Sequence, residues 1–137
     1  MGNADRPLSE KVILLVEDDL VLGELLGLLL RQRTGARTVT SPSERGLFAL
    51  LRDAYVDAVV IDGDLRGDDG WSLPRRLKAD PETASILTVG YSGIGKRGRP
   101  LALAAGFDAY VGKDEGSDRL VHVLVRLLAS ASSPGLS

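Results

Sequence analysis

Residues 59–65 read Val59-Val60-Ile61-Asp62-Gly63-Asp64-Leu65, and this stretch decides the fold. Three β-branched apolar residues run directly into an acid. A bare apolar run of this kind is typical of a strand buried on both faces of a parallel sheet. Asp62 then lies at the carboxyl end of its strand, where open α/β sheets place their functional residues. We therefore expect the other strands to supply Asp62 with neighbours.

The alternation of a strand with a helix occurs five times along the chain. Strands are expected at 12–16, 36–40, 56–61, 86–91 and 108–111, and helices at 20–33, from the 41–44 stretch to 53, at 71–79, just before Gly106 and from 117 onward. This alternation predicts an α/β fold with one doubly wound, five-stranded parallel sheet and helices on both faces. Five strands favour the flavodoxin-like order 2-1-3-4-5, which places the first and third strands side by side.

Local signals indicate where three of these helices begin. The stretch Ser41-Pro42-Ser43-Glu44 has the form of a capping box with proline at the first helical position. Pro74 is expected in the first turn of its helix, where the missing N–H costs little. Asp19 is expected to cap the first helix.

Length and composition favour one soluble domain. The 137 residues predict a single domain over 1–137, with its core at about 10–130 and flexible tails at 1–9 and 131–137. A net charge of −2 does not suggest a nucleic-acid or membrane surface. The absence of cysteine excludes disulfides and thiolate metal sites, and one histidine, His122, excludes a histidine cluster. No apolar run approaches the roughly 20 residues of a membrane span, and the N-terminus lacks a signal peptide, so a cytoplasmic location is expected.

Polar side chains follow four of the predicted strands. Glu17 and Asp18 follow the first strand, Asp62 the third, Ser92 the fourth and Lys113 the fifth. Parallel strands end at the same edge of a sheet, so these side chains can converge there. Two carboxylates about 4 Å apart repel by about 4 kcal/mol at an effective dielectric constant of about 20. Mg²⁺, which prefers oxygen ligands, would relieve that repulsion.

The same constellation suits phosphoryl chemistry. Lys113 can bind a phosphoryl group as a point charge, and the Ser92 hydroxyl can donate to one of its oxygens. The Asp62 carboxylate is then placed as a nucleophile toward phosphorus.

The chain resembles the response regulator receiver domains, the CheY-like family of two-component signalling. The resemblance covers about residues 10–130 and rests on five features in order: Ile13-Leu14-Leu15-Val16-Glu17-Asp18-Asp19; Val59-Val60-Ile61-Asp62 with Leu65 and Asp69-Gly70; Ser92-Gly93; the run from Ala102 through Gly106 to Tyr110; and Lys113. Each motif alone is weak, whereas five in order at compatible spacing are specific.

The resemblance implies a role for each matching residue. Asp62 would be the phosphoacceptor, and Glu17 and Asp18 would hold Mg²⁺ together with Asp62. The backbone carbonyl of Asp64 would be a further metal ligand.

The remaining matches would sense the phosphoryl group. Ser92 would be the switch hydroxyl, Lys113 the phosphate-binding residue, and Tyr110 an aromatic switch that turns inward when Ser92 moves. Thr88 is a rival hydroxyl inside its strand, and Tyr110 is equally well read as plain core.

The resemblance also implies the partners. The donor would be a phosphohistidine on a histidine kinase or phosphotransfer protein. A stand-alone receiver would signal through a protein contact, to a second copy or to an unknown downstream target. The surface would be made by the fourth helix, the fifth strand and the last helix. The chain is then a signalling domain that assists its own phosphorylation and dephosphorylation, and not an enzyme; neither nucleic acid nor membrane is an expected partner.

The chain departs from the family pattern in four places. Asp114 follows Lys113 where the family usually has proline, and Arg66 also replaces a usual proline. The loop 93–100 is rich in glycine, and the spacing from Ser92 to Lys113 looks one residue short. The altered last loop keeps open a pseudo-receiver, a binding module that works without phosphate.

An enzyme is a further alternative. Asp62-Gly63-Asp64 imitates the paired aspartates of haloacid-dehalogenase-like phosphatases. That family, however, has Thr or Val where Arg66 stands, and its motif follows the first strand.

Overall fold

The computed structural model describes residues 6–62 and 68–132. Its main elements are β1 (Val12–Val16), α2 (Leu20–Thr34), β2 (Arg37–Ser41), α3 (Glu44–Asp53), β3 (Ala58–Asp62), α4 (Asp68–Ala79), β4 (Leu87–Ser92), α5 (Arg99–Ala104), β5 (Ala109–Gly112) and α6 (Ser117–Ser132). Two short 3₁₀ turns, η1 (Lys96–Gly98) and η2 (Lys113–Glu115), precede α5 and α6.

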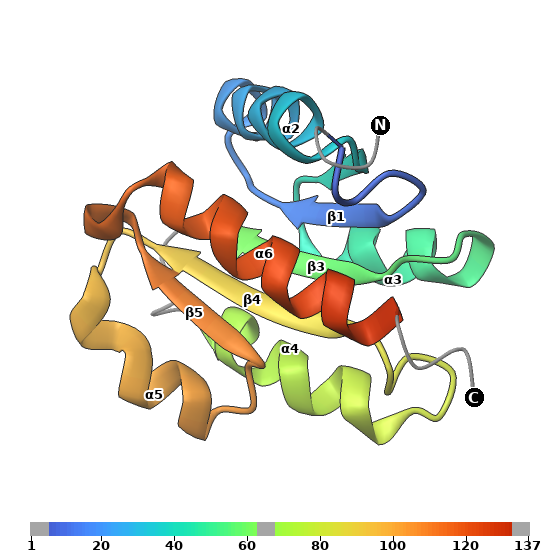
Figure 1. Cartoon of the computed structure of the whole chain (residues 1–137). Helices are drawn as coiled ribbons and strands as arrows, with labels where there is room; N and C mark the ends of the chain where they lie inside the picture. Colours follow the sequence, from blue (N-terminus) through green and yellow to red (C-terminus); the bar gives the residue numbers. More distant parts are fainter. Residues whose placement is uncertain (1–5, 63–67, 133–137) are drawn as a thin grey trace.

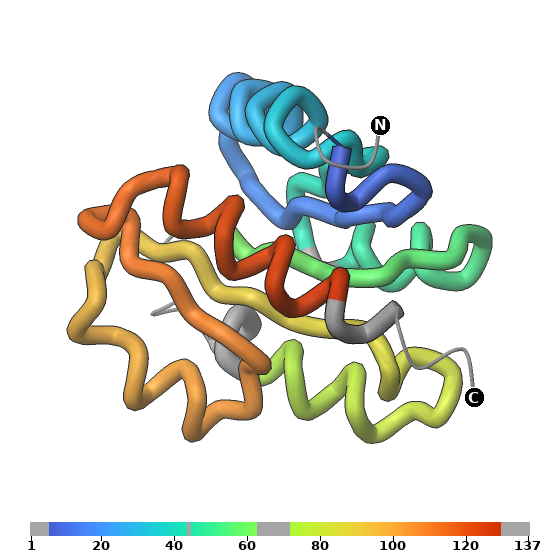
Figure 2. Tube along the Cα trace, viewed as in Figure 1, coloured from blue at the N-terminus to red at the C-terminus, as the bar shows by residue number. Residues whose placement is uncertain are grey.

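The strands form one parallel sheet in the order β2-β1-β3-β4-β5 (Figure 1). This confirms the predicted fold class and strand order. Helices cover both faces of the sheet, as the trace in Figure 2 shows. Buried leucines of α2 and α6, such as Leu30 and Leu124, belong to the core on one face. Leu47 of α3 and Leu77 of α4 belong to the core on the other.

Strand β3 lies at the centre of the sheet, and all of its residues are buried. Asp62 is its last residue and pairs in register with Tyr91 of β4. Ile61 pairs with Val16 of β1, so Glu17 follows at the same edge of the sheet. The register therefore brings together segments that are far apart in the sequence, because parallel strands all end on one side.

The caps of α2 follow the sequence signals. The side chain of Asp19 accepts hydrogen bonds from the backbone N–H groups of Val21 and Leu22 at 3.0 and 3.1 Å, so its expected capping role is confirmed. Gly35 ends the helix at a φ of 81°, a left-handed conformation that glycine adopts without steric cost.

Two helix starts differ from the expectation. Helix α3 is capped by Ser43, whose hydroxyl accepts from the N–H of Gly46 at 3.2 Å, and not by Ser41. Ser41 instead donates its hydroxyl to the carbonyl of Ser43, so the predicted capping box is wrong. Helix α4 begins at Asp68 rather than near Trp71, which places Pro74 in the helix interior and not in its first turn.

The ordered core also reaches further toward both ends than expected. Leu8, which we expected in a flexible tail, is fully buried, and its N–H donates to the carbonyl of Thr34 at 2.8 Å. Helix α6 continues to Ser132, beyond the predicted core limit of about residue 130.

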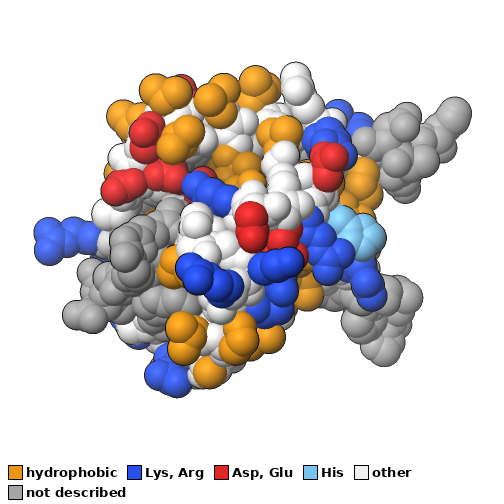
Figure 3. All heavy atoms as spheres, turned by 90° about the vertical axis from the view of Figure 1, so that its left-hand side faces the viewer, with side chains coloured by type: hydrophobic (Ala, Val, Ile, Leu, Met, Phe, Trp, Pro, Cys, Tyr) orange, Lys and Arg blue, Asp and Glu red, His pale blue; other side chains and the backbone are white. Residues whose placement is uncertain are grey.

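Hydrophobic side chains are exposed along α2. The set consists of Leu20, Val21, Leu22, Leu25 and Leu28. Figure 3 shows hydrophobic side chains gathered at the top of the molecule, over this helix. The apolar residues of α2 thus lie on its outer side as well as in the core. Within residues 6–62 and 68–132, no helix combines the length and apolar character needed to cross a bilayer.

Candidate functional site

Asp62 and Lys113 form the centre of the site. Asp62 is buried, with 8% of its surface exposed, and its Oδ1 lies 2.6 Å from Nζ of Lys113. The contact is therefore a close, charge-assisted ion pair. Burial alone would lower the pKa of Lys113, but the contact with Asp62 outweighs it and the net pKa is raised. Lys113 is therefore a cation held directly beside the predicted phosphoacceptor.

Glu17 is the second buried carboxylate of the site. Only 3% of its surface is exposed, and it accepts a hydrogen bond from the N–H of Asp19 at 2.9 Å. Burial, together with the neighbouring carboxylates of Asp18 and Asp62, raises the pKa of Glu17 to about 7, while the Asp19 hydrogen bond acts in the opposite direction. Repulsion within an acidic group is thus present around Glu17, as the sequence predicted.

The predicted metal ligands are brought together only in part. Glu17 and Asp62 lie side by side at the sheet edge, and Asp18 beside Glu17 is exposed to solvent. Asp64 lies outside the described residues. Within residues 6–62 and 68–132, no three His, Cys, Asp or Glu side chains are close enough to hold a metal ion on their own. The donor set still suits a hard cation, because carboxylate oxygens with water and a backbone carbonyl complete the sites Mg²⁺ prefers.

Ser92 is the last residue of β4 and is fully buried. Its hydroxyl oxygen accepts a hydrogen bond from the N–H of Ile94 at 3.1 Å, which leaves its own proton available for another acceptor. The rival hydroxyl, Thr88, donates to the carboxylate of Asp108 at 3.2 Å. Thr88 lies near the opposite end of the strand, and its partner Asp108 lies just before β5. Ser92, at the carboxyl end of β4, is therefore the better-placed hydroxyl.

The Tyr110 ring is already inside the protein. It is 3% exposed, and its hydroxyl donates to the carbonyl of Gly95 at 2.8 Å. This buried position agrees with the reading of Tyr110 as part of the core, and its role as an aromatic switch stays a prediction. In this arrangement Tyr110 holds the β4–α5 loop against β5.

Sequence reasoning did not find Tyr91 as part of the site. Tyr91 pairs with Asp62 in the sheet, and Nζ of Lys113 lies 5.5 Å from its ring centre. A cation over an aromatic face is favourable, so the ring helps to position the lysine. Burial, and then the charge of Asp62, raises the pKa of Tyr91 and keeps its hydroxyl protonated. Its place beside the predicted switch hydroxyl was visible in the sequence, but its pairing with Asp62 depends on strand register.

Asp114 and Glu115 also have contacts that the sequence did not suggest. Oδ1 of Asp114 accepts a hydrogen bond from the N–H of Lys96 at 2.9 Å. Glu115 forms an ion pair with Arg99 and accepts from the N–H of Gly112 at 2.8 Å. The turn that follows Lys113 is therefore joined to the loop that follows Ser92.

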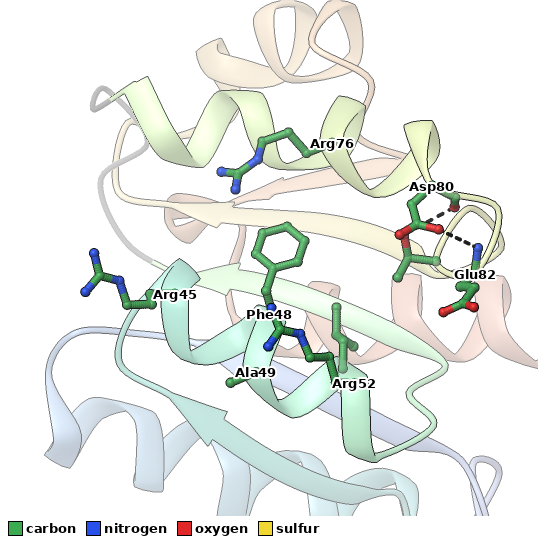
Figure 4. Close-up of a pocket in the computed structure, with 9 residues that line it drawn as sticks. Arg45, Phe48, Ala49, Arg52, Arg76, Asp80 and Glu82 are labelled. Atoms are coloured by element: carbon green, nitrogen blue, oxygen red, sulfur yellow. Dashed lines mark hydrogen bonds between the residues drawn. The ribbon is translucent and has the colours of Figure 1, made fainter.

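A separate hollow lies between α3 and α4. Its volume is about 760 Å³, and Figure 4 shows Arg45 and Phe48 of α3 facing Arg76 of α4 across it. The guanidinium of Arg76 lies 4.7 Å from the centre of the Phe48 ring. None of the predicted site residues lines this hollow.

The family of the chain follows from sequence comparison. The family model described as response regulator receiver domain matches residues 13–125. The chain therefore belongs to the response regulator receiver domain family, and the recognised resemblance is confirmed. This is a signalling family of two-component systems and not a family of classical enzymes.

Individual relatives agree with this assignment. The chain is 28% identical over 119 residues to the phosphate regulon transcriptional regulatory protein PhoB of Pseudomonas aeruginosa, a match that covers 86% of this chain and 52% of that protein. The chain thus spans about half the length of this curated relative. Its fold matches the receiver domain of a DNA-binding response regulator from Colwellia psychrerythraea 34H, at a TM-score of 0.74, 25% identity and coverage of 86% and 98% of the two chains. A receiver protein from Burkholderia phymatum shares the fold at a TM-score of 0.72, 24% identity and coverage of 87% and 95%.

Proposed function

We propose that this receiver domain accepts a phosphoryl group on Asp62 from a phosphohistidine of a histidine kinase or phosphotransfer protein. The observation that carries the proposal is the buried Oδ1 of Asp62, which lies 2.6 Å from Nζ of Lys113 at the carboxyl edge of the sheet. A buried carboxylate held beside a single lysine has a nucleophilic oxygen and a cation for phosphoryl oxygens in one place.

The transfer needs a nucleophile and charge stabilisation. An oxygen of Asp62 bonds to phosphorus as the bond from phosphorus to the imidazole nitrogen breaks, and the electron pair of that bond returns to the imidazole. Lys113 stabilises the negative charge on the phosphoryl oxygens from one side. The Ser92 hydroxyl, whose proton is available, donates to another of these oxygens.

Mg²⁺ would be held by Glu17, Asp18 and Asp62, with the backbone of Asp64 as a further ligand. The ion neutralises phosphoryl charge when it is bound. The raised pKa of Glu17, which is due first to burial and then to the nearby carboxylates of Asp18 and Asp62, supports this assignment, because a bound cation would stabilise the charged form.

The output would be a protein contact on the surface of α5, β5 and α6. Leu101 and Leu103 of α5 are 66% and 47% exposed and give this surface apolar contact area. Movement of Ser92 toward the phosphoryl group would displace Ile94, which is bonded to the Ser92 hydroxyl, and with it the start of α5. A target or a second copy of the chain would respond to that displacement.

Intact mass measurement tests the proposal. The protein is incubated with Mg²⁺ and acetyl phosphate, a small acyl phosphate, and one added phosphoryl group is expected. Asp62→Asn should abolish the addition because an amide is a far poorer nucleophile, whereas Asp118→Asn, at an exposed aspartate, should not. Turnover of a phosphate ester would instead support the phosphatase alternative. No added mass under any condition would favour the pseudo-receiver.

A further inference from the structure

The loop after Ser92 and the turn after Lys113 lie against each other at the carboxyl edge of the sheet. We call residues 93–98 the β4–α5 segment and η2 (Lys113–Glu115) the lysine turn. Figure 3 looks onto this edge, where acidic and basic side chains lie close together. These contacts include Asp114 and the glycine-rich loop, at which this chain departs from its family pattern.

Asp114 makes the first contact. Its Oδ1 accepts the hydrogen bond from the backbone N–H of Lys96 at 2.9 Å, across 18 positions of sequence. The usual proline of the family has no side-chain acceptor and could not make this bond. The substitution therefore adds a connection that the resemblance does not imply.

Glu115 makes the second contact. Its carboxylate accepts from the N–H of Gly112, and it also pairs with Arg99 at the start of α5. The hydrogen bond from Gly112, and then the charge of Arg99, lowers the pKa of Glu115, so the carboxylate remains charged at neutral pH. The lysine turn thus holds both the segment and the first residue of the helix that follows it.

Close backbone approach makes the third contact. A Cβ atom at Gly112 would lie 2.3 Å from backbone atoms of Gly95 and Lys96, so only glycine leaves room for the segment. Gly95 has a φ of 89°, in the left-handed region, and a Cβ there would lie 3.1 Å from the Asp114 carboxylate. Together with the bond from Tyr110 to Gly95, these positions fix the path of the segment.

We infer that Asp114 fastens the β4–α5 segment to the lysine turn and that Glu115 holds Arg99 at the start of α5, so that the segment and Lys113 move as one body. This deepens the proposed function, because it connects the phosphate-binding residue to the same segment that Ser92 reaches from the other side. Asp114 acts here as a positioning residue, through its hydrogen bond with the Lys96 amide.

Amide hydrogen exchange of the unphosphorylated protein tests the inference. The Lys96 amide should be protected, and Asp114→Ala should lower that protection at least about fivefold, the equilibrium equivalent of one net hydrogen bond. Asp114→Asn keeps an acceptor oxygen and should retain most of the protection. Asp118→Ala is the matched control, because Asp118 pairs with Arg33 on the surface and should leave Lys96 unchanged.

A second variant tests the same contact from the other side. Gly112→Ala should push the segment away and expose the Lys96 amide, whereas Gly93→Ala, where an added Cβ meets nothing within 4 Å, should not. The amide of Val60 in the central strand reports whether each variant remains folded. Wild-type exchange of Lys96 in the folded Asp114→Ala protein would overturn the inference.

Beryllofluoride, a phosphoryl mimic, separates this inference from the proposed function. Lys96 of the wild type should be equally protected with and without it, because the segment is fastened in both states. Protection that arises only with beryllofluoride would overturn the inference. Failure of beryllofluoride to bind at Asp62 would count against phosphoryl transfer and leave the exchange result without beryllofluoride intact.

Discussion

Nζ of Lys113 lies 2.6 Å from the buried Oδ1 of Asp62. The lysine comes from the end of β5 and the aspartate from the end of β3, with β4 between them in the sheet. The ion pair therefore joins the ends of two strands that are not neighbours in the sheet. Removing one partner of such a pair leaves a buried charge without compensation.

Lys113→Ala is expected to lower the free energy of unfolding by about 1–3 kcal/mol, because the Asp62 carboxylate remains buried. The lysine side chain is 35% exposed, so solvent screening places the effect toward the lower end. Urea unfolding at pH 8 measures it. The double variant Lys113→Ala with Asp62→Asn should recover stability, and equal destabilisation of the two proteins would show that the pair is not the cause.

The raised pKa of Glu17 predicts a pH dependence of stability in metal-free protein. The pKa is about 7 in the folded state against 4.5 for the free group, so the folded protein binds more protons between these values. The free energy of unfolding should therefore fall as the pH rises from about 4.5 to about 7, by an amount on the order of 3 kcal/mol. The quantity to compare is the difference between wild type and Glu17→Gln at pH 5 and pH 8. A difference that does not change with pH would contradict the assignment.

Mg²⁺ binding should depend on Asp18 and on pH. Asp18→Asn removes one anionic ligand and is expected to weaken binding by about tenfold or more. Binding to the wild type should be tighter at pH 8 than at pH 6 and should release protons, because Glu17 must be deprotonated to act as a ligand. Calorimetric titration in buffers of different ionisation enthalpy measures both effects. Asp19→Asn is the control, since Asp19 caps α2, and the site is misassigned if both variants lose affinity equally.

Ser92→Ala should still allow Asp62 to accept the phosphoryl group but should block the conformational change that follows. The variant keeps Asp62 and Lys113, so labelling by acetyl phosphate should continue. It loses the hydroxyl group, which accepts a hydrogen bond from the N–H of Ile94 and would donate one to the phosphoryl group. Backbone amide spectra with and without beryllofluoride should show changes extending to α5 in the wild type and confined to the metal site in the variant. Identical, far-reaching changes in both proteins would exclude Ser92 as the connection.

The sheet and its edge could be predicted because they depend on local pattern. The apolar runs that end in Glu17 and Asp62 identify buried strands, and alternation with helices leaves few strand orders. Asp19 and Gly35 are likewise residue types that favour the N-terminal and C-terminal caps of a helix. The helix starts were harder, because Ser41 and Ser43 are equally good capping residues in isolation. The helix expected from residue 71 already begins at Asp68.

The contacts of the last loop could not be predicted for a different reason. Asp114 bonds to Lys96 and Glu115 pairs with Arg99, and each contact depends on how two separate loops approach. The sequence marked Asp114 as a departure from the family and gave no indication of its partner. The hydrogen bond of Tyr110 could not be predicted for the same reason, because its acceptor is a backbone carbonyl of a loop.

The exposed leucines of α2 have a consequence for solubility. Leu20, Leu25 and their neighbours present apolar area to water on a chain whose net charge is only −2. Little long-range repulsion then opposes collisions between copies, and it vanishes near the isoelectric point of about 5.4. Concentrated solutions should therefore be most prone to precipitation in mildly acidic buffer, and a moderately alkaline buffer is the better choice for storage.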